Sequence, residues 1–230
     1  MFKLQNIMDL FFPRQCACCD TRLLGEEDTL CLKCLLHLPR TNTWEQPFDN
    51  EMAKMFWHRI AVERCCALFY FQSHSFASRI IYQLKYAHRP DIGVYLGRCL
   101  AQEGLRHDFF EDIDAIVPIP LTKRRKRQRG YNQSEEIAKG ISSLTHLPVI
   151  TDAVERTKFT ESQTHKGRWE RLENVQQVFR LTNGTNISGK HLLIVDDVCT
   201  TGATIIACCE QLAKAGNVRF SILSLGYAKD

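Results

Sequence analysis

The chain has 230 residues, of which 44% are hydrophobic and 24% are charged, a composition that excludes a largely disordered protein and suits one ordinary domain with a small appendage. No apolar run approaches the ~18 residues that would span a bilayer. The net charge of +4 is local, because six of the 30 basic residues lie between Lys123 and Arg129 and the other 24 are outnumbered by 26 acidic ones. Such a patch indicates a binding site for a polyanion.

The first segment, Met1 to Phe12, is apolar, but Asp9 interrupts it and no small-residue cleavage site follows, so it does not match a secretory signal. Without a signal we expect a cytoplasmic protein, whose thiols stay reduced. The apolar residues of this segment share one helical face: Leu4, Ile7, Met8 and Phe11.

Four of the 11 cysteines form two C-x-x-C pairs near the N-terminus: Cys16, Cys19, Cys31 and Cys34. Two such pairs can present four thiolates tetrahedrally to Zn²⁺, and a segment this short has too small a core to fold without a staple. A redox site or an empty site is the alternative. Cys18 would replace Cys19 as a ligand only with a different turn, and His37 is not needed because four cysteines complete the shell.

The middle of the chain predicts a linker, a strand and two helices. Pro39 to Asp49 has no clear periodicity and is expected to link a zinc-ribbon-like module, residues 1–45, to a main domain, residues 46–230. Arg64 to Phe71 is typical of a strand, Phe76 to Tyr86 has helical spacing, and Asp91 is a candidate cap for a helix reaching toward Gly104. Five further cysteines have apolar neighbours and are interpreted as buried packing residues: Cys65, Cys66, Cys99, Cys208 and Cys209.

Strands and helices alternate in the second half. The strands are predicted at Ala115 to Ile119, His191 to Val195 and Val218 to Leu225, with a short extended piece from Pro148 to Ile150. One helix is predicted from the capping-box pair Asn132 and Glu135 through Ser142, and another from Thr204 to Ala215, stopped by Gly216. A basic loop is expected between the first strand and the first helix. This order predicts an α/β fold, with a parallel sheet flanked by helices on both faces.

The strongest functional signal is the segment Leu192 to Thr204, in which an apolar strand is followed by two acids and a threonine-rich turn. Asp196 and Asp197 would reach the carboxyl end of the sheet, where they can accept hydrogen bonds from sugar hydroxyls and orient a hydrated Mg²⁺. The turn leads into a helix N-terminus, which favours a phosphate, through Thr200, Thr201, Gly202, Ala203 and Thr204. A phosphate beside a diol describes a ribose phosphate; the alternative is that these residues only start a turn and cap a helix.

At these residues the chain resembles the type I phosphoribosyltransferases, and more narrowly the ComF family, which includes proteins associated with DNA uptake in competence and the related GntX proteins. Further matches occur in the family's order over nearly the whole chain: Cys16 to Cys34, Leu84-Lys85-Tyr86, Val117-Pro118-Ile119-Pro120, Arg129-Gly130-Tyr131-Asn132-Gln133, and the spaced Gln163, Arg168, Asn174 and Phe179. The resemblance implies a type I phosphoribosyltransferase-like fold that binds phosphoribosyl pyrophosphate (PRPP). Asp196 and Asp197 would then be the catalytic pair on the ribose hydroxyls, with Thr200 to Thr204 on the ribose phosphate.

The basic run follows the strand that ends at Pro120, so it should lie at the same edge of the sheet as the acids. Its cations are Lys123, Arg124, Arg125, Lys126 and Arg127. The resemblance implies that this loop binds the pyrophosphate and that PRPP also contacts Lys85, Arg129, Tyr131, Asn132 and Gln133. Together with Arg129 the run carries six positive charges, more than one pyrophosphate needs, so the surplus binds a nucleic-acid backbone, with Tyr131 as a stacking face, or is a solvated charge run. Lys85 is either a ligand-facing amine or a snorkelling helix lysine.

Two functions fit these observations. The first is an enzyme that binds PRPP with Mg²⁺ and transfers its phosphoribosyl group to an acceptor that the sequence does not identify. The second is a non-catalytic, PRPP-responsive protein that binds single-stranded DNA and works with the DNA-uptake machinery. Thr157 to Arg168 is a candidate for a flexible loop that closes over the site, and it contains no clear acceptor-binding group.

Overall fold

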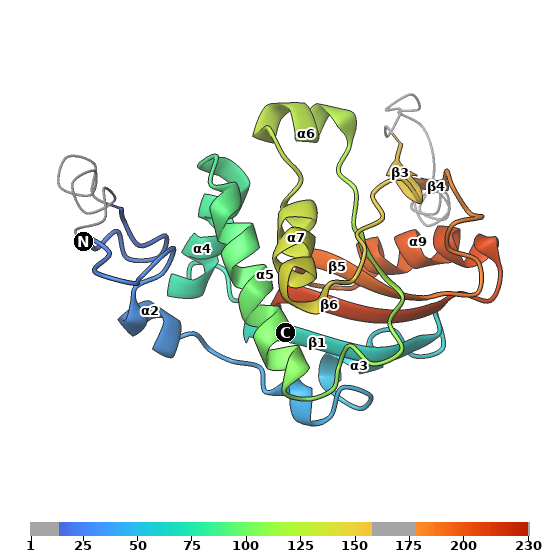
Figure 1. Cartoon of the computed structure of the whole chain (residues 1–230), viewed down its shortest axis with the longest axis horizontal. Helices are drawn as coiled ribbons and strands as arrows, with labels where there is room; N and C mark the ends of the chain where they lie inside the picture. The colour runs from blue at the N-terminus through green and yellow to red at the C-terminus, as the bar shows by residue number, and fades with distance from the viewer. Residues whose placement is uncertain (1–13, 158–177, 230) are drawn as a thin grey trace, which may run out of the picture.

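A four-stranded parallel sheet forms the centre of the protein (Figure 1). The computed structural model describes residues 14–157 and 178–229. The strands lie in the order β1-β6-β5-β2, and every neighbouring pair is parallel. They are β1 (Val62–Tyr70), β2 (Ala115–Pro118), β5 (His191–Cys199) and β6 (Arg219–Tyr227). The predicted parallel α/β sheet is therefore confirmed.

Helices cover both faces of this sheet because successive side chains of a buried strand point to opposite faces. Along β5, Leu193 and Val195 pack in one hydrophobic cluster and Leu192 and Ile194 in the other. The first cluster contains α4 (Phe76–Tyr86), α5 (Pro90–Leu105) and α7 (Gln133–Thr145). The second contains α3 (Glu51–Lys54) and α9 (Ala203–Leu212), which is extended by the 3-10 turn η2 (Ala213–Ala215) and ends at Gly216. Both faces of the sheet are apolar, as expected when helices cover a sheet on both sides.

The buried cysteines are also divided between the two hydrophobic clusters. Cys65, Cys66, Cys208 and Cys209 are fully buried in these clusters, which confirms their interpretation as packing residues, and Cys99 is half-buried against the first cluster. Burial raises the pKa of the Cys66 thiol to about 12, so it stays protonated at neutral pH.

Helix α5 begins differently from the sequence prediction. Pro90 occupies its first turn and Arg89 is the residue before it, so Asp91 lies inside the first turn instead of capping it. Proline at this position has its backbone angle fixed for a helix and loses no hydrogen bond. The Asp91 carboxylate instead accepts hydrogen bonds of 2.7–3.0 Å from the Arg89 guanidinium.

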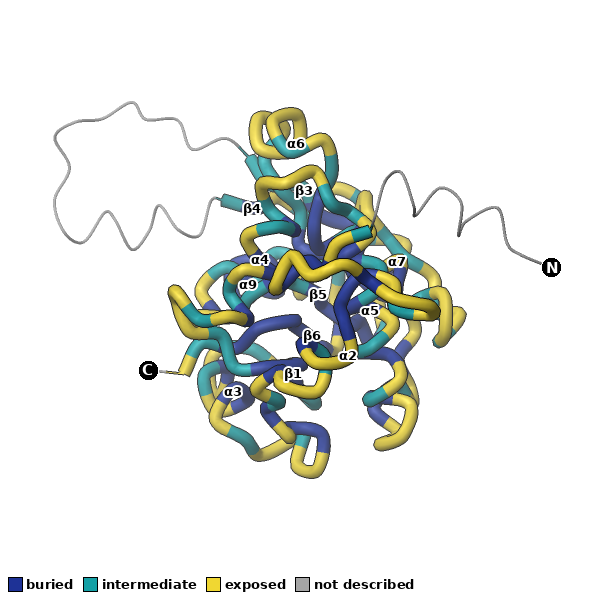
Figure 2. Tube along the Cα trace, turned by 90° about the vertical axis from the view of Figure 1, so that its left-hand side faces the viewer, coloured by how far each residue is buried: buried dark blue, intermediate teal, exposed yellow. Residues whose placement is uncertain are grey.

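The basic run is a helix, α6 (Lys123–Arg129), and not the loop that the sequence analysis predicts. Lysine and arginine are strong helix formers, and both ends of the run are capped. The Thr122 hydroxyl accepts a hydrogen bond from the Arg125 backbone N–H at 3.3 Å, and Gly130 ends the helix with a φ of +82°. The helix projects from the sheet at the top of Figure 1, and most of its residues are exposed in Figure 2.

The cysteine-bearing segment packs against α4. It contains the short helix α2 (Leu32–Leu36), and its buried cysteines belong to the same hydrophobic cluster as α4. The Cys18 thiol donates a hydrogen bond to the Phe76 carbonyl oxygen at 3.3 Å, and Arg79 pairs with Asp20 at 2.8 Å. The cysteine-bearing segment is therefore held against α4, one of the helices that cover the sheet.

Pro39 to Asp49, expected as a linker, is packed along the edge strand β1. It contains the 3-10 turn η1 (Thr43–Glu45), and the carbonyl oxygens of Pro39 and Pro47 accept hydrogen bonds from β1 at 2.7 and 2.8 Å. The Trp44 ring meets the Phe109 ring edge-on at 5.4 Å. The segment satisfies backbone groups that an edge strand would otherwise expose.

Two short antiparallel strands, β3 (Val154–Arg156) and β4 (Phe179–Leu181), stand beside α6 (Figure 1) and were not predicted. The residues between 158 and 177, which hold most of the candidate closing loop and the matches at Gln163, Arg168 and Asn174, lie outside the described residues. So does the proposed helical face of Met1 to Phe12. Within the described part of the chain, no helix is long and apolar enough to cross a membrane.

Candidate functional site

The two predicted acids lie near the carboxyl end of β5. The strand extends to Cys199 because its pairing with β6 continues past the acids, with Asp196 opposite Ser224. The Lys85 amine, from α4, lies 2.9 Å from the Asp197 Oδ1 atom. The Asp196 Oδ1 atom accepts hydrogen bonds from the Ser134 hydroxyl at 3.2 Å and from the Asp197 N–H at 2.9 Å. Three elements therefore meet at the carboxylate pair.

The electrostatics of this pair favour a cationic or proton-donating ligand. Burial, and next the neighbouring negative charge of Asp197, raise the pKa of Asp196 to about 7. Lys85 and the Ser134 hydroxyl act in the opposite direction. A carboxyl with a pKa near neutrality changes its charge readily when a ligand brings positive charge or hydroxyl donors.

The turn after β5 exposes a helix N-terminus beside the acids. Thr200 and Thr201 are exposed, and Gly202 precedes α9 with a φ of +69°. A side chain at Gly202 would bring its Cβ to 2.8 Å from the Phe56 ring, so both the backbone angle and the space require glycine. No side chain among the described residues caps α9, which leaves its first N–H groups available to an anion.

A cationic cavity of about 620 Å³ adjoins Lys85 on the side of α6. Its lining comes from the end of α4 and one face of α6: Lys85, Tyr86, His88, Arg125, Gln128 and Arg129. Residues three and four apart share a helix face, so Arg125, Gln128 and Arg129 face the cavity together. Of the six predicted basic residues, two line this cavity, and the rest of the run is exposed or pairs with Glu135 through Lys126 at 2.8 Å.

The residues after α6 are held by the protein itself. The Tyr131 hydroxyl donates to the Leu84 carbonyl oxygen, and the Asn132 side chain caps α7 and donates to the Ile119 carbonyl oxygen at 3.0 Å. Gln133 is buried and accepts a hydrogen bond from Arg129 at 2.8 Å, while its Nε2 atom has no hydrogen-bond partner among the described residues. Tyr131 and Asn132 thus fix the start of α7, and Gln133 holds Arg129 in place.

Two residues near the acids were missed by the sequence analysis. Ser134 reaches Asp196 from a position 62 residues earlier, and Arg156 on β3 is close enough to Asp196 and Arg125 for their charges to affect it. Burial, followed by Arg125, lowers the pKa of Arg156, whose guanidinium lies 5.3 Å from the centre of the Phe179 ring. A serine in a helix and an arginine in a three-residue strand carry no local signal that would single them out.

The four predicted cysteine ligands form a cluster. The sulfur atoms of Cys16, Cys19, Cys31 and Cys34 all lie within 4.8 Å of one another. Cys16 Sγ accepts hydrogen bonds from the backbone N–H groups of Cys18 and Cys31 at 3.5 and 3.3 Å. Such bonds stabilise a thiolate, so the donor set fits a metal such as Zn²⁺.

Comparison with known proteins agrees with this geometry. Residues 99–225 match the phosphoribosyl transferase domain family. The DNA utilization protein YhgH of Escherichia coli strain K12 is 32% identical over 209 residues, which cover 87% of this chain and 85% of that protein. The chain belongs to the ComF family of phosphoribosyltransferase-domain proteins.

Other relatives of this ComF-family chain carry competence names. Competence protein F of Haemophilus influenzae is 31% identical over 116 residues, covering 50% of this chain and 51% of that protein. Competence protein ComFC of Bacillus subtilis is 32% identical over 106 residues, covering 45% and 41%. Among solved structures, the glutamine PRPP amidotransferase of B. subtilis matches 61% of this chain and 30% of its own, with 20% identity and a TM-score of 0.42.

Proposed function

We propose that this protein binds PRPP together with Mg²⁺ at the carboxyl end of β5. The observation that carries the proposal is the convergence of three ligand-binding features: the Asp196–Asp197 pair, the uncapped start of α9 and the cationic cavity beside Lys85. A ribose with a phosphate on one carbon and a pyrophosphate on another needs these three environments side by side. The family match supports the same ligand.

Each part of PRPP has a partner of suitable chemistry in this arrangement. Asp196 and Asp197 accept hydrogen bonds from the two ribose hydroxyls, and the turn from Thr200 to Thr204 holds the ribose phosphate with backbone N–H groups and hydroxyls. Arg125 and Arg129 meet the pyrophosphate in the cationic cavity. Asp196 and Asp197 would also orient a hydrated Mg²⁺ bound with PRPP, which would supply positive charge to stabilise the departing pyrophosphate.

Transfer of the phosphoribosyl group to an acceptor is the reaction that this arrangement supports. A nucleophile on the acceptor would form the new bond to the ribose carbon as the bond to pyrophosphate breaks. The leaving pyrophosphate remains with Arg125 and Arg129, and the fixed carboxylates hold the ribose during the displacement. No covalent intermediate with the protein is needed.

Calorimetric titration of PRPP, with and without Mg²⁺, tests the binding. We expect binding only with Mg²⁺, and its loss in the double variant Asp196→Asn with Asp197→Asn, which keeps the size and polarity of both side chains. A matched control changes Asp108 and Asp112 to Asn, because both are exposed acids in left-handed conformations that asparagine adopts readily. Undiminished binding by the Asp196 and Asp197 variant refutes the proposal.

Zn²⁺ is proposed as the structural metal of the four-cysteine cluster. Four cysteine sulfurs are the donor set of closed structural zinc sites. The thiolates need a reducing environment, so the proposal also includes a cytoplasmic location. In this role the metal fixes the segment that packs on α4 and takes no part in the reaction.

Binding of single-stranded DNA is a second candidate function. Three cations of α6 neither line the cavity nor pair with Glu135, and they are exposed on a helix next to the proposed PRPP site: Lys123, Arg124 and Arg127. A row of exposed cations of this kind suits a phosphate backbone. The relatives named for DNA utilization and competence support this candidate and a role in DNA uptake.

A further inference from the structure

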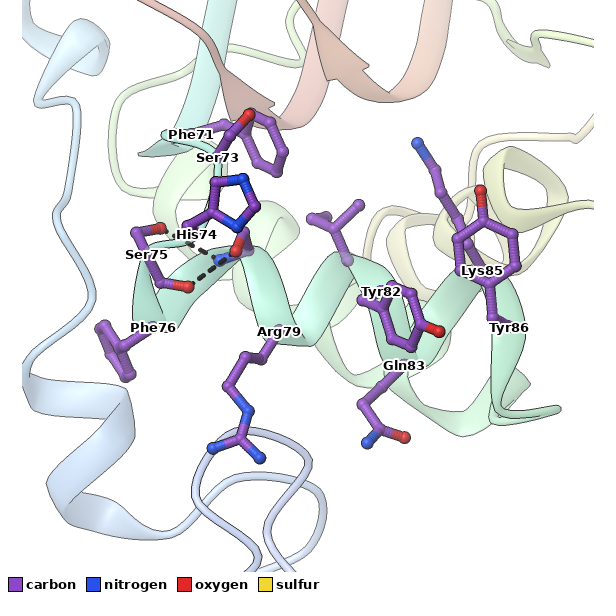
Figure 3. A pocket seen from close by; sticks show the side chains of 12 residues that line it. Phe71, Ser73, His74, Ser75, Phe76, Arg79, Tyr82, Gln83, Lys85 and Tyr86 are labelled. Carbon is purple, nitrogen blue, oxygen red and sulfur yellow. Dashed lines mark hydrogen bonds between the residues drawn. The ribbon is translucent and has the colours of Figure 1, made fainter.

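The exposed side of α4 carries two tyrosines one helical turn apart. Tyr82 is 63% exposed and Tyr86 is 57% exposed, and their ring centroids are 4.9 Å apart with a tilt of 48° (Figure 3). Large aromatic side chains are usually buried, so two neighbouring exposed rings indicate a binding surface. Neither ring contributes to the hydrophobic clusters that hold α4 on the sheet.

These tyrosines stand in a surface groove of about 770 Å³. The groove follows α4 from the β1–α4 connection to the end of the helix (Figure 3), and its lining runs from Phe71 and His74 through Phe76 and Tyr82 to Lys85 and Tyr86. Eleven helical residues extend for about 16 Å, which is longer than one planar base. The groove therefore suits a chain-like ligand with flat groups along it.

The groove joins the cationic cavity at one end. Lys85 and Tyr86 line both, and the Arg129 guanidinium lies 5.3 Å from the centre of the Tyr86 ring. Beyond Arg129 are the exposed cations of α6. Aromatic rings next to a row of cations are the two components that bind single-stranded nucleic acids, because bases stack on the rings and phosphates meet the cations.

Tyr82 and Tyr86 are better placed to stack on bases than Tyr131, the residue expected from the sequence. Tyr131 is packed against the first hydrophobic cluster, and its hydroxyl is bonded to the Leu84 carbonyl oxygen. Its ring is therefore fixed by the fold. Tyr82 and Tyr86 are not part of the hydrophobic clusters, and each residue is more than half exposed.

We propose that the α4 groove binds single-stranded nucleic acid, with bases stacked on Tyr82 and Tyr86 and with phosphates held by α6. The proposal deepens the second candidate function and does not depend on PRPP binding. It places the strand next to the acid pair, with Lys85 and Tyr86 at the junction. A duplex would fit less well because its base faces are already stacked on one another.

Fluorescence anisotropy with a labelled oligo-dT, an oligo-U and a duplex of the same length tests this. We expect the single strands to bind more tightly than the duplex, and Tyr82→Ala and Tyr86→Ala each to weaken single-strand binding about tenfold or more. Tyr82→Phe and Tyr86→Phe should retain binding, because stacking needs the ring and not the hydroxyl. The dependence of affinity on salt should keep its slope in the alanine variants, since every cation that meets a phosphate is still present.

Phe48→Ala is the matched control. Phe48 is 61% exposed and has Arg64 over its ring at 5.9 Å, but it lies beside the first half of β1, whereas α4 follows the end of that strand. We expect it to leave single-strand binding unchanged. Unchanged binding by the Tyr82 and Tyr86 double alanine variant, or an equal loss in Phe48→Ala, overturns the proposal.

The PRPP titration separates this proposal from the proposed function. Tyr82 lies outside the cationic cavity, so Tyr82→Ala should bind PRPP with the affinity of the original protein. If the original protein binds PRPP but no single strand, the groove proposal fails together with the second candidate function, and the proposed PRPP binding stands. If it binds single strands through the tyrosines but no PRPP, the groove proposal stands and the proposed function fails.

Discussion

At the scale of single residues, the acid pair combines a proposed role in ligand binding with a cost in stability. The Asp196 carboxyl lies among buried neighbours and next to a second carboxylate. Among the described residues, the Ser134 hydroxyl, a backbone N–H and the charges of Lys85 and Arg156 offset this cost. Residues that bind ligands often carry such a cost, because the ligand supplies the missing partners. PRPP and its cation are the proposed partners.

The raised pKa of Asp196 predicts a stability change with pH. Between its ordinary value of 3.8 and its folded value of about 7, the folded chain binds more protons at this site than the unfolded chain does. The stabilisation is therefore full below about pH 4 and is lost progressively as the pH rises to about 7. Asp196→Asn keeps the acceptor oxygen without the charge, so we expect it to raise the free energy of unfolding by about 2–4 kcal/mol at about pH 8 and by little at about pH 4.

Urea unfolding without ligand at the two pH values measures this difference. Asp108→Asn, at an exposed position, should be neutral at both. If the Asp196→Asn variant is no more stable than the original protein at the higher pH, the Asp196 charge does not destabilise the fold and this prediction is wrong.

The site residues that the sequence could identify are those that are contiguous. Asp196 to Thr204 form one strand–turn–helix unit, so a single segment predicts the acids and the phosphate turn together. Ser134 and Arg156 reach the same place only through the packing of α7 and β3 around the sheet. The sequence alone also does not decide whether Lys85 faces the ligand or solvent, because helical spacing does not show which strand α4 packs against. The structure places the Lys85 amine beside Asp197.

At the scale of elements, α6 has two faces with different expected roles. Arg125 and Arg129 line the cavity, whereas Lys123, Arg124 and Arg127 face solvent. Changing the first two to Gln should weaken PRPP binding about tenfold or more, because the charge-assisted bonds to phosphate disappear. Changing the outer three to Gln should leave PRPP binding within about twofold and reduce the salt slope of single-strand binding by about 0.7 for each phosphate that no longer meets a cation.

Calorimetry and salt-dependent anisotropy on the two variants provide the comparison. Each variant serves as the control for the other, because both change the charge of the same helix. An equal effect of both variants on PRPP would mean that α6 acts through its total charge and not through the face that lines the cavity.

The elements were predicted where periodicity and caps agree. β1, β5, β6, α4 and α9 appear close to their predicted ranges, since their apolar spacing reflects the buried sheet. The α6 helix was missed because an unbroken cationic run has no apolar period, although Thr122 and Gly130 are its caps. β3 and β4 were missed because each has three residues and pairs with a partner distant in the chain.

At the scale of the whole molecule, the cysteine cluster and the sheet share one hydrophobic cluster. The boundary between residues 45 and 46 stays a prediction, because Cys16, Cys34 and Leu38 pack in the same cluster as the helices of the main sheet. Loss of the metal should therefore reach beyond the cysteine segment and loosen α4, which carries Lys85 and the tyrosine groove.

Metal analysis and thermal unfolding test the role of zinc. We expect about one equivalent of Zn²⁺ per chain, and chelation or Cys34→Ser to lower the unfolding temperature by several degrees. Cys99→Ser, at a half-buried cysteine outside the cluster, should retain the zinc. Less than about half an equivalent of zinc in the purified protein contradicts a structural metal site.

A crystal structure of the protein with PRPP and Mg²⁺ would show whether PRPP occupies the carboxyl end of β5. We expect the ribose hydroxyls within hydrogen-bond distance of Asp196 and Asp197, the ribose phosphate at Thr200 to Thr204, and the pyrophosphate beside Arg125 and Arg129. PRPP bound elsewhere, with the carboxylate pair free of the ligand, would contradict the proposed function.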